Sequence, residues 1–259
     1  MTVATFQTAI DGVNPFVVEG PATLGSGVIV PQFRLGHVAY GDAETEWVYC
    51  KYTSVANQVL QPGLVFVVDD DFNATIASTS TTLKGTKLMV CGVGLGYGTQ
   101  SAGAVTTVTG LVYYMWLARA GQMPVMYTAA AGGAGSQGEL TATAGSLSFP
   151  AALTGGATRA ATAIYITKAV GGTFTGDITN GSTQVINLVG LAIDTGPAWV
   201  GATLSATGIA SSQTITAIQY TGTRATSLTL SAAATVTNTA QTITSTLQTQ
   251  ARVMWAYTT

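Results

Sequence analysis

Charged side chains are scarce in this sequence. Asp, Glu, Lys and Arg together make up 8% of the 259 residues, whereas about 25% is usual in a globular domain. The nine Lys and Arg are scattered singly and the formal net charge is -2, so no basic stripe could neutralise a run of phosphates and we expect no nucleic-acid partner. A surface with so few charges has to be covered by uncharged polar side chains or by other subunits, which favours an assembly.

Histidine and cysteine are almost absent as well. His37 is the only histidine, and Cys50 and Cys91 are the only cysteines. No ordinary metal cluster of Cys and His can therefore be built within one chain, and the three residues form no recognisable Cys-His nucleophilic motif. We predict no metal and no cofactor. In a reducing compartment the two cysteines are expected to be buried thiols, with a disulfide between them as the alternative.

Long apolar runs and a basic leader are also missing. Apolar stretches such as 110–117 fall well short of the roughly 20 residues that a membrane helix needs. The start of the chain, MTVATFQTAIDGVNPF, has no basic segment followed by an apolar run, so a secretion signal is not visible. We expect a soluble protein that is made in the cytoplasm and has no membrane partner.

The sequence does contain many short segments with strand character. They are rich in β-branched and aromatic residues and are bounded by Gly, Asn, Asp or Pro. Apolar residues at helical spacing are not sustained over three turns, although 100–109 and 154–162 could hold a short helical turn. We predict an all-β fold with a β-barrel or sandwich-like main domain. The expected strands are 46–52, 64–68, 87–93, 111–118, 124–128, 163–167, 214–220, 227–231 and 251–257.

Changes in composition divide the chain into three parts. Residues 1–32 hold three of the seven prolines and little alternation, which predicts an extended arm that is free to reach a neighbour. Residues 172–246 are a succession of Thr-rich short strands with a hairpin turn at Asn180-Gly181, which predicts a small β-sandwich module. The segments on either side of this module resemble strands of one host. We therefore assign 33–171 and 247–259 to the main β domain and treat the module as an insertion.

The stretch CGVGLGYG (91–98) has four glycines at alternate positions. It is not a dinucleotide-binding loop, because the G-x-G-x-x-G spacing, the following helix and the acidic residue about 20 positions later are all missing. In an extended strand the four glycines would share one face and leave it open to another backbone or a bulky side chain. A sharp bend at a barrel corner is the alternative.

Two groups of carboxylates are the candidates for chemistry. Glu44 and Glu46 lie two positions apart, and a glycosidase needs two carboxylates across a bond, but a solvated hairpin tip explains them better. The run 69–71, three aspartates directly after an apolar strand, could offer oxygens to calcium, yet it lacks the ligand spacing and closing Glu of a dedicated loop. We favour a polar turn there. Nothing in the sequence resembles an active site, and we predict that the protein is not an enzyme.

Several segments together resemble the capsid decoration, or cement, proteins of tailed bacteriophages. The pattern begins with Leu35-Gly36 and an acidic and aromatic strand, continues with Gln61-x-Gly63 before a strand ended by Asp, and closes on an aromatic strand followed by Ala120-Gly121. The later VGATLSATGI (200–209) is similar to small β modules of phage structural proteins. The similarities cover most of 33–259, while the long N-terminal arm and the inserted module depart from the shorter members.

The resemblance implies a structural virion protein on the outer surface of the capsid. Its partners would be the major capsid protein and neighbouring copies of itself, as a trimer or dimer, and it would stabilise the shell by bridging capsid subunits. An extended arm can bury much surface and add a strand to a neighbour's sheet edge. The expected capsid or subunit contacts are Phe6, Phe16 and Phe33, with Arg34 as a polar anchor.

A head or tail fibre protein is the alternative. In that case the inserted module would bind glycan on the host cell surface, and aromatic rings would stack on the sugars. The residues expected to do so are Trp199 and Tyr220.

Overall fold

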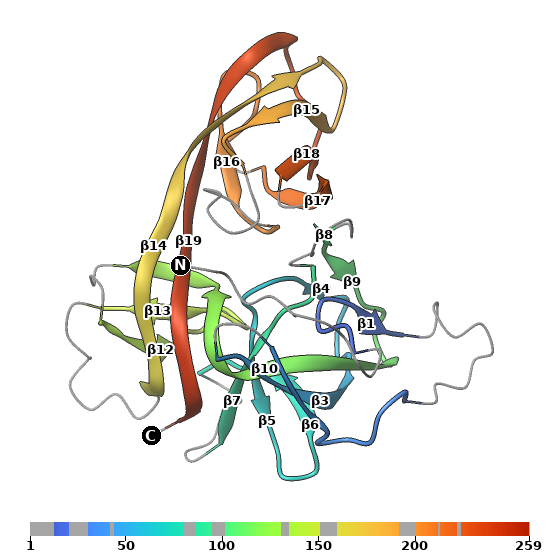
Figure 1. The fold of residues 1–259 in the computed structure, drawn as a ribbon, viewed down its shortest axis with the longest axis vertical. Coiled ribbons are helices and arrows are strands. Elements are labelled where there is room, and N and C mark those ends of the chain that lie inside the picture. Colours follow the sequence, from blue (N-terminus) through green and yellow to red (C-terminus); the bar gives the residue numbers. More distant parts are fainter. Residues whose placement is uncertain are drawn as a thin grey trace.

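The computed structural model shows an all-β protein with a main domain and a smaller module above it (Figure 1). No helix is present in the part of the chain that it describes. The described ranges are 13–20, 31–41, 44–79, 86–94, 102–130, 135–150, 160–191, 200–211, 213–221 and 224–258.

Most strands are short, and the three longest are β10, β14 and β19 with 14, 19 and 21 residues. Their bounds are β1 Val18–Glu19, β2 Val38–Tyr40, β3 Glu46–Thr53, β4 Val59–Leu60, β5 Val65–Val68, β6 Asn73–Ile76, β7 Lys87–Cys91, β8 Ala102–Gly103, β9 Val105–Thr106, β10 Val112–Val125, β11 Tyr127–Ala130, β12 Gln137–Leu140, β13 Leu147–Phe149, β14 Ala160–Ile178, β15 Gln184–Val189, β16 Thr203–Ser205, β17 Ile215–Thr221, β18 Arg224–Leu230 and β19 Asn238–Thr258.

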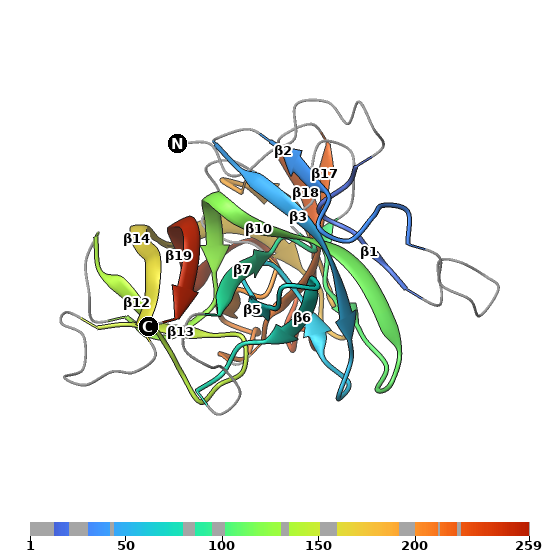
Figure 2. The ribbon, with the colours of Figure 1, turned by 90° about the horizontal axis from the view of Figure 1, so that it is seen from below.

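The main domain is built around β10. This strand pairs antiparallel with β1, β3, β7 and β19, and Figure 2 shows it passing across the others. Side chains of a strand alternate between the two faces of a sheet. Trp116 and Ala118 therefore join one apolar cluster while Met115 and Leu117 join another. Because both faces of β10 and β3 are buried, these strands are almost continuously apolar in sequence.

A ribbon of two long strands connects the main domain to the module. β14 and β19 pair antiparallel from Ala161 opposite Thr258 to Ile178 opposite Asn238, and Figure 1 shows them running from the main domain to the top of the molecule. The module has its own apolar cluster, whose fully buried members all lie between Phe174 and Ile243. The expected boundaries of the module, 172–246, therefore enclose this second core.

A short strand of the main domain also contacts the module. β8 pairs with β17, the N–H of Ala104 donates to the carbonyl of Thr216 at 3.1 Å, and the Ala104 side chain packs against the module's core. The module is thus joined to the main domain by β8 as well as by the ribbon.

The expectation of a free arm over 1–32 is wrong for residues 13–20. β1 pairs with β10, and Val13 and Phe16 are buried at 5% and 6% exposure. The Phe16 ring meets Trp47 edge to face with 6.0 Å between centroids. Since two apolar side chains here complete the core of their own domain, this segment is not available to a neighbour. Residues 1–12 and 21–30 lie outside the described ranges.

The glycine-rich stretch bends where β7 ends. β7 stops at Cys91 and a turn follows at 93–94, with φ +84° at Gly94. A Cβ on Gly92 would lie 2.6 Å from the Trp47 ring, and one on Gly94 would lie 2.6 Å from the carbonyl oxygen of Gly103. Close approach of a bulky side chain and of another backbone is therefore confirmed at these two glycines. The chain bends after Cys91, so the expectation of a continuous strand through 91–98 is wrong. Positions 95–98 lie outside the described residues.

Candidate functional site

The two glutamates of the β2–β3 hairpin do not form a catalytic pair. Glu44 is exposed in the turn at φ +60°, as expected for a hairpin tip. Glu46 instead lies at the start of β3, where its Oε2 accepts a hydrogen bond from Nε of Arg119 at 2.7 Å. Both partners of this ion pair are about four-fifths buried. The carboxylate of Glu46 is thus committed to holding β3 against β10.

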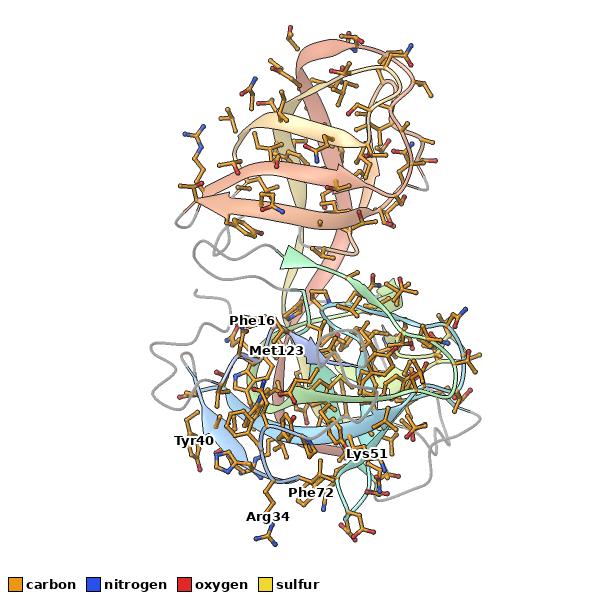
Figure 3. The ribbon with its side chains drawn as sticks, turned by 90° about the vertical axis from the view of Figure 1, so that its right-hand side faces the viewer. Phe16, Arg34, Tyr40, Lys51, Phe72 and Met123 are labelled. Atoms are coloured by element: carbon orange, nitrogen blue, oxygen red, sulfur yellow. The ribbon has the colours of Figure 1, made fainter. Side chains whose placement is uncertain are left out.

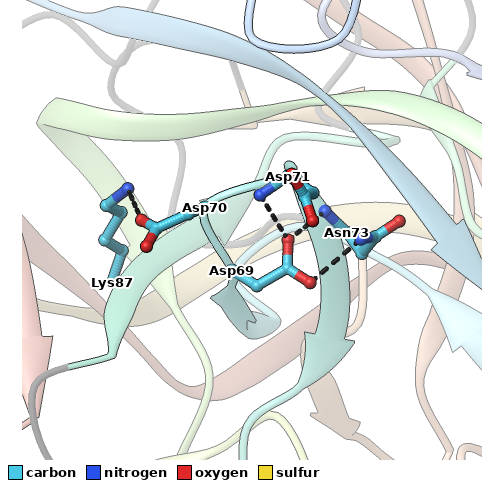
Figure 4. A network of polar contacts seen from close by, with 5 residues as sticks. All are labelled: Asp69, Asp70, Asp71, Asn73 and Lys87. Atoms are coloured by element: carbon cyan, nitrogen blue, oxygen red, sulfur yellow. Dashed lines mark hydrogen bonds and ion pairs between the residues drawn. The ribbon is translucent and has the colours of Figure 1, made fainter.

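The three aspartates after β5 form a polar turn, as favoured from the sequence (Figure 4). Oδ1 of Asp69 accepts hydrogen bonds from the N–H groups of Asp71 and Asn73 at 3.0 and 2.8 Å, and its Oδ2 accepts one from the Asn73 amide at 2.9 Å. Asp70 pairs with Lys87 at 2.6 Å, and that hydrogen bond lowers the pKa of the Asp70 carboxyl. The carboxylates point to separate partners and do not converge on a common point.

An aromatic cluster lies beside the start of β2. Phe33 stacks on His37 with 5.6 Å between ring centroids and meets Trp116 and Tyr49 edge to face at 5.1 and 5.4 Å. Phe33 is half-buried and His37 is exposed. The expected contact residue Phe33 therefore packs mainly within its own domain, and His37 is the exposed member of the cluster.

Tyr49 fixes the segment that leads into this cluster. Its hydroxyl donates to Oε2 of Glu19, which also accepts the N–H of Gln32 at 3.2 Å. Burial of the ring, followed by the hydrogen bond and charge of Glu19, raises the pKa of Tyr49. The hydroxyl therefore keeps its proton and holds β1 and the chain before β2 together.

Of the four residues expected to contact the capsid, Arg34 is the one that the structure places at the surface. It projects from the lower end of the main domain, far from the module (Figure 3). Phe16 is buried in the core, so its assignment as a contact is wrong, and Phe6 lies outside the described residues.

The glycan site expected in the alternative function is not formed by Tyr220. Its side chain is buried at 5% exposure in the module's core, because it lies on the face of β17 that packs against this core. A buried ring offers no surface on which a sugar could stack, so this assignment is wrong. Trp199 lies outside the described residues.

Both cysteines are buried free thiols, which confirms the first of the two readings. Burial raises the pKa of each to about 12. In the described ranges no group of three or more His, Cys, Asp or Glu side chains could hold a metal ion, and no helix there has the length and apolar character to cross a membrane.

Sequence reasoning missed one surface residue. Tyr40 closes β2 and is 69% exposed, and Figure 3 shows it near Arg34 at the lower end of the main domain. No local pattern in the sequence marks it, because its exposure depends on which segments pack against β2. The candidate site is therefore the exposed surface along β2 and the turn before it, with Arg34, His37 and Tyr40. We call this surface the rim.

This rim has no arrangement of acid, base and nucleophile. It combines an exposed guanidinium, an exposed imidazole and an exposed phenol ring along a strand edge, which are groups that suit recognition of another protein surface. Comparison of the chain with protein-family models, with curated proteins and with solved structures finds no match.

Proposed function

We propose that this chain is a structural protein of a virion, a decoration protein that binds the outer surface of a bacteriophage capsid and stabilises it by bridging major capsid proteins. The observation that carries the proposal is that charged side chains are few and that several of them pair with each other. In the described main domain Glu46 pairs with Arg119 and Asp70 with Lys87, so these carboxylates are occupied by ion pairs within the chain and do not converge on a common point.

The shape of the molecule supports the same role. The main domain presents the rim with Arg34, His37 and Tyr40 at one end, and the β14–β19 ribbon carries a second core at the other end. A protein that lies on a shell needs a docking end and an end that faces away. The low charge further favours apolar and hydrogen-bonding contacts, which salt screens little.

Co-sedimentation with empty shells tests this function. The shells are assembled from the major capsid protein of the same virus, and the purified chain should pellet with them to a saturable ratio at low and high salt. A proteinaceous particle of unrelated origin serves as the control. Failure of the chain to pellet with the shells at any salt concentration would rule the function out.

The same assay tests the role of the N-terminal arm. Deleting residues 1–30 would remove Val13 and Phe16 from the core, so the deletion should end at residue 12. We expect loss of Phe6 with this segment to weaken attachment while the thermal midpoint stays unchanged. Unaltered attachment would show that the segment has no part in docking.

A further inference from the structure

β2 (Val38–Tyr40) is an edge strand. In the described part of the chain it pairs with β3 alone, in a register that places Ala39 opposite Trp47. It lies at the end of the main domain away from the module, where the ring of Tyr40 projects outward (Figure 3). An exposed edge offers N–H and C=O groups to another strand.

The hydrogen bonding of β2 shows which of its main-chain groups are open. The N–H of Gly41 donates to the carbonyl of Thr45 at 2.9 Å. Hydrogen-bonded and non-hydrogen-bonded pairs alternate along an antiparallel ladder, so Ala39 directs its main-chain groups toward β3 while Val38 and Tyr40 direct theirs away. Among the described residues the outward groups of Val38 and Tyr40 meet no other main-chain partner.

A second copy of β2 fits this edge in one antiparallel register. With a two-fold axis through Ala39, Val38 of each copy lies opposite Tyr40 of the other, and their outward N–H and C=O groups can exchange hydrogen bonds. The same axis brings the start of one strand beside the end of the other. Arg34 is exposed in the turn before the start and Glu44 is exposed in the turn after the end, so the axis turns opposite charges toward each other at both ends of the pair.

We propose that the β2 edge is a two-fold homodimer interface in which two copies of this chain form a continuous sheet. The charge pattern argues for a second copy as the occupant, because Arg34 and Glu44 are exposed beyond opposite ends of β2 and the two-fold axis turns each toward the opposite charge of the other copy. A three-residue strand buries less than the roughly 1,000 Å² of a stable interface. The dimer is therefore weak in free solution and is strengthened when copies are held close together in an assembly. It does not require that the assembly be a capsid.

Charge reversal tests the two-fold register. In Arg34→Glu homodimers two carboxylates face each other at both ends, and in Glu44→Arg homodimers two guanidinium groups do so. Each variant alone should dimerise about tenfold more weakly than the wild type, measured by sedimentation equilibrium. An equimolar mixture of the two variants restores opposite charges at both ends, so it should form a heterodimer as strong as the wild-type dimer.

Two substitutions of Tyr40 test the main-chain hydrogen bonds. Tyr40→Ser removes the exposed ring and keeps the outward N–H, whereas Tyr40→Pro removes both, and proline is tolerated at a strand edge. Tyr40→Pro should dimerise more weakly than Tyr40→Ser. Arg224→Glu, an exposed change in the module, is the control and should leave dimerisation unchanged.

The outcomes separate this proposal from the proposed function. Recovery of the dimer in the mixture supports the interface, whether or not the chain pellets with shells. The proposal is overturned if the wild type is monomeric up to about 0.5 mM, if it forms another oligomer that all the variants retain, or if the mixture stays as weak as its components. Matching thermal midpoints confirm folding, and the charge variants decide the question if Tyr40→Pro does not fold.

Discussion

At Gly92 the main chain lies against the ring of Trp47. The ring is fully buried and a Cβ at this position would lie 2.6 Å from it. The glycine is required by this close packing and not by an unusual backbone angle. A substitution there forces a rigid indole to move within a dense core, where overpacking commonly costs about 1–3 kcal/mol.

We expect Gly92→Ala to lower the free energy of unfolding by about 2 kcal/mol. Gly103→Ala is the matched control, because no atom lies within 4 Å of the added Cβ, and it should change stability by less than about 0.5 kcal/mol. Urea denaturation of both variants measures the difference. Equal stability of the two variants would contradict the packing role of Gly92.

The thiols of Cys50 and Cys91 make stability depend on pH in alkaline solution. Burial raises both pKa values to about 12, whereas unfolded thiols ionise near pH 8.5. Between these values the unfolded chain binds fewer protons than the native one, so the free energy of unfolding falls as pH rises, by about 1.4 kcal/mol per pH unit for each thiol.

Urea titrations from pH 8 to about 11 measure this slope. The double variant Cys50→Ala/Cys91→Ala should show a flatter dependence, and iodoacetamide at pH 8 should label the wild type only after urea is added. Rapid labelling of the native protein at either cysteine would show that the thiol is not protected by burial.

Among the elements, the β5–β6 turn depends on one side chain. Asp69 accepts two main-chain N–H groups and one side-chain amide, which replace the hydrogen bonds that a regular ladder would supply. The turn includes Phe72 at φ +62°, a backbone conformation that is unfavourable without such support.

We expect Asp69→Ala to lower the free energy of unfolding by about 1–2 kcal/mol, because main-chain donors lose a charged acceptor. Asp71→Ala is the control, since the side chain of Asp71 is exposed, and it should have little effect. Thermal unfolding distinguishes the two variants. If calcium raises the midpoint of the wild type but not of Asp69→Ala, the turn is a metal site and our account of it is wrong.

The whole molecule has separate cores joined by a continuous ribbon. The module's core lies within 174–243, and the clusters of the main domain contain no residue of that range. Partial unfolding is therefore expected to involve one core while the other stays folded. The ribbon and β8 join the two parts, and among the described side chains no buried residue belongs to more than one cluster.

Leu204→Ala should destabilise the module selectively. Leu204 is fully buried, and its truncation should cost about 2–5 kcal/mol. Hydrogen exchange should show lost protection within 172–246 and unchanged protection in β5 and β7, while Val65→Ala, a buried residue of the main domain, should show the reverse. Loss of protection throughout the chain in both variants would show one cooperative unit.

Much of the architecture follows from local patterns in the sequence. Short β-branched and aromatic segments bounded by Gly, Asn and Asp predicted the all-β class, and the Thr-rich texture placed a module whose expected range encloses the second core. Asp69 and Glu44 were correctly read as turn residues because their neighbours in sequence decide that role. Buried free thiols followed from the strand context of the cysteines.

What tertiary structure alone decided is which side chains remain at the surface. Phe16 and Tyr220 are aromatic and were expected to contact partners, yet they fill cores assembled from strands distant in sequence. Tyr40 is exposed on β2, which pairs with β3 alone among the described residues. The sequence by itself determined the all-β class and the position of many strands and turns, since these depend on nearby residues, whereas the full length of β10, β14 and β19 did not follow from it. Burial and strand edges depend on which segments meet across the fold, and no local pattern carries that information.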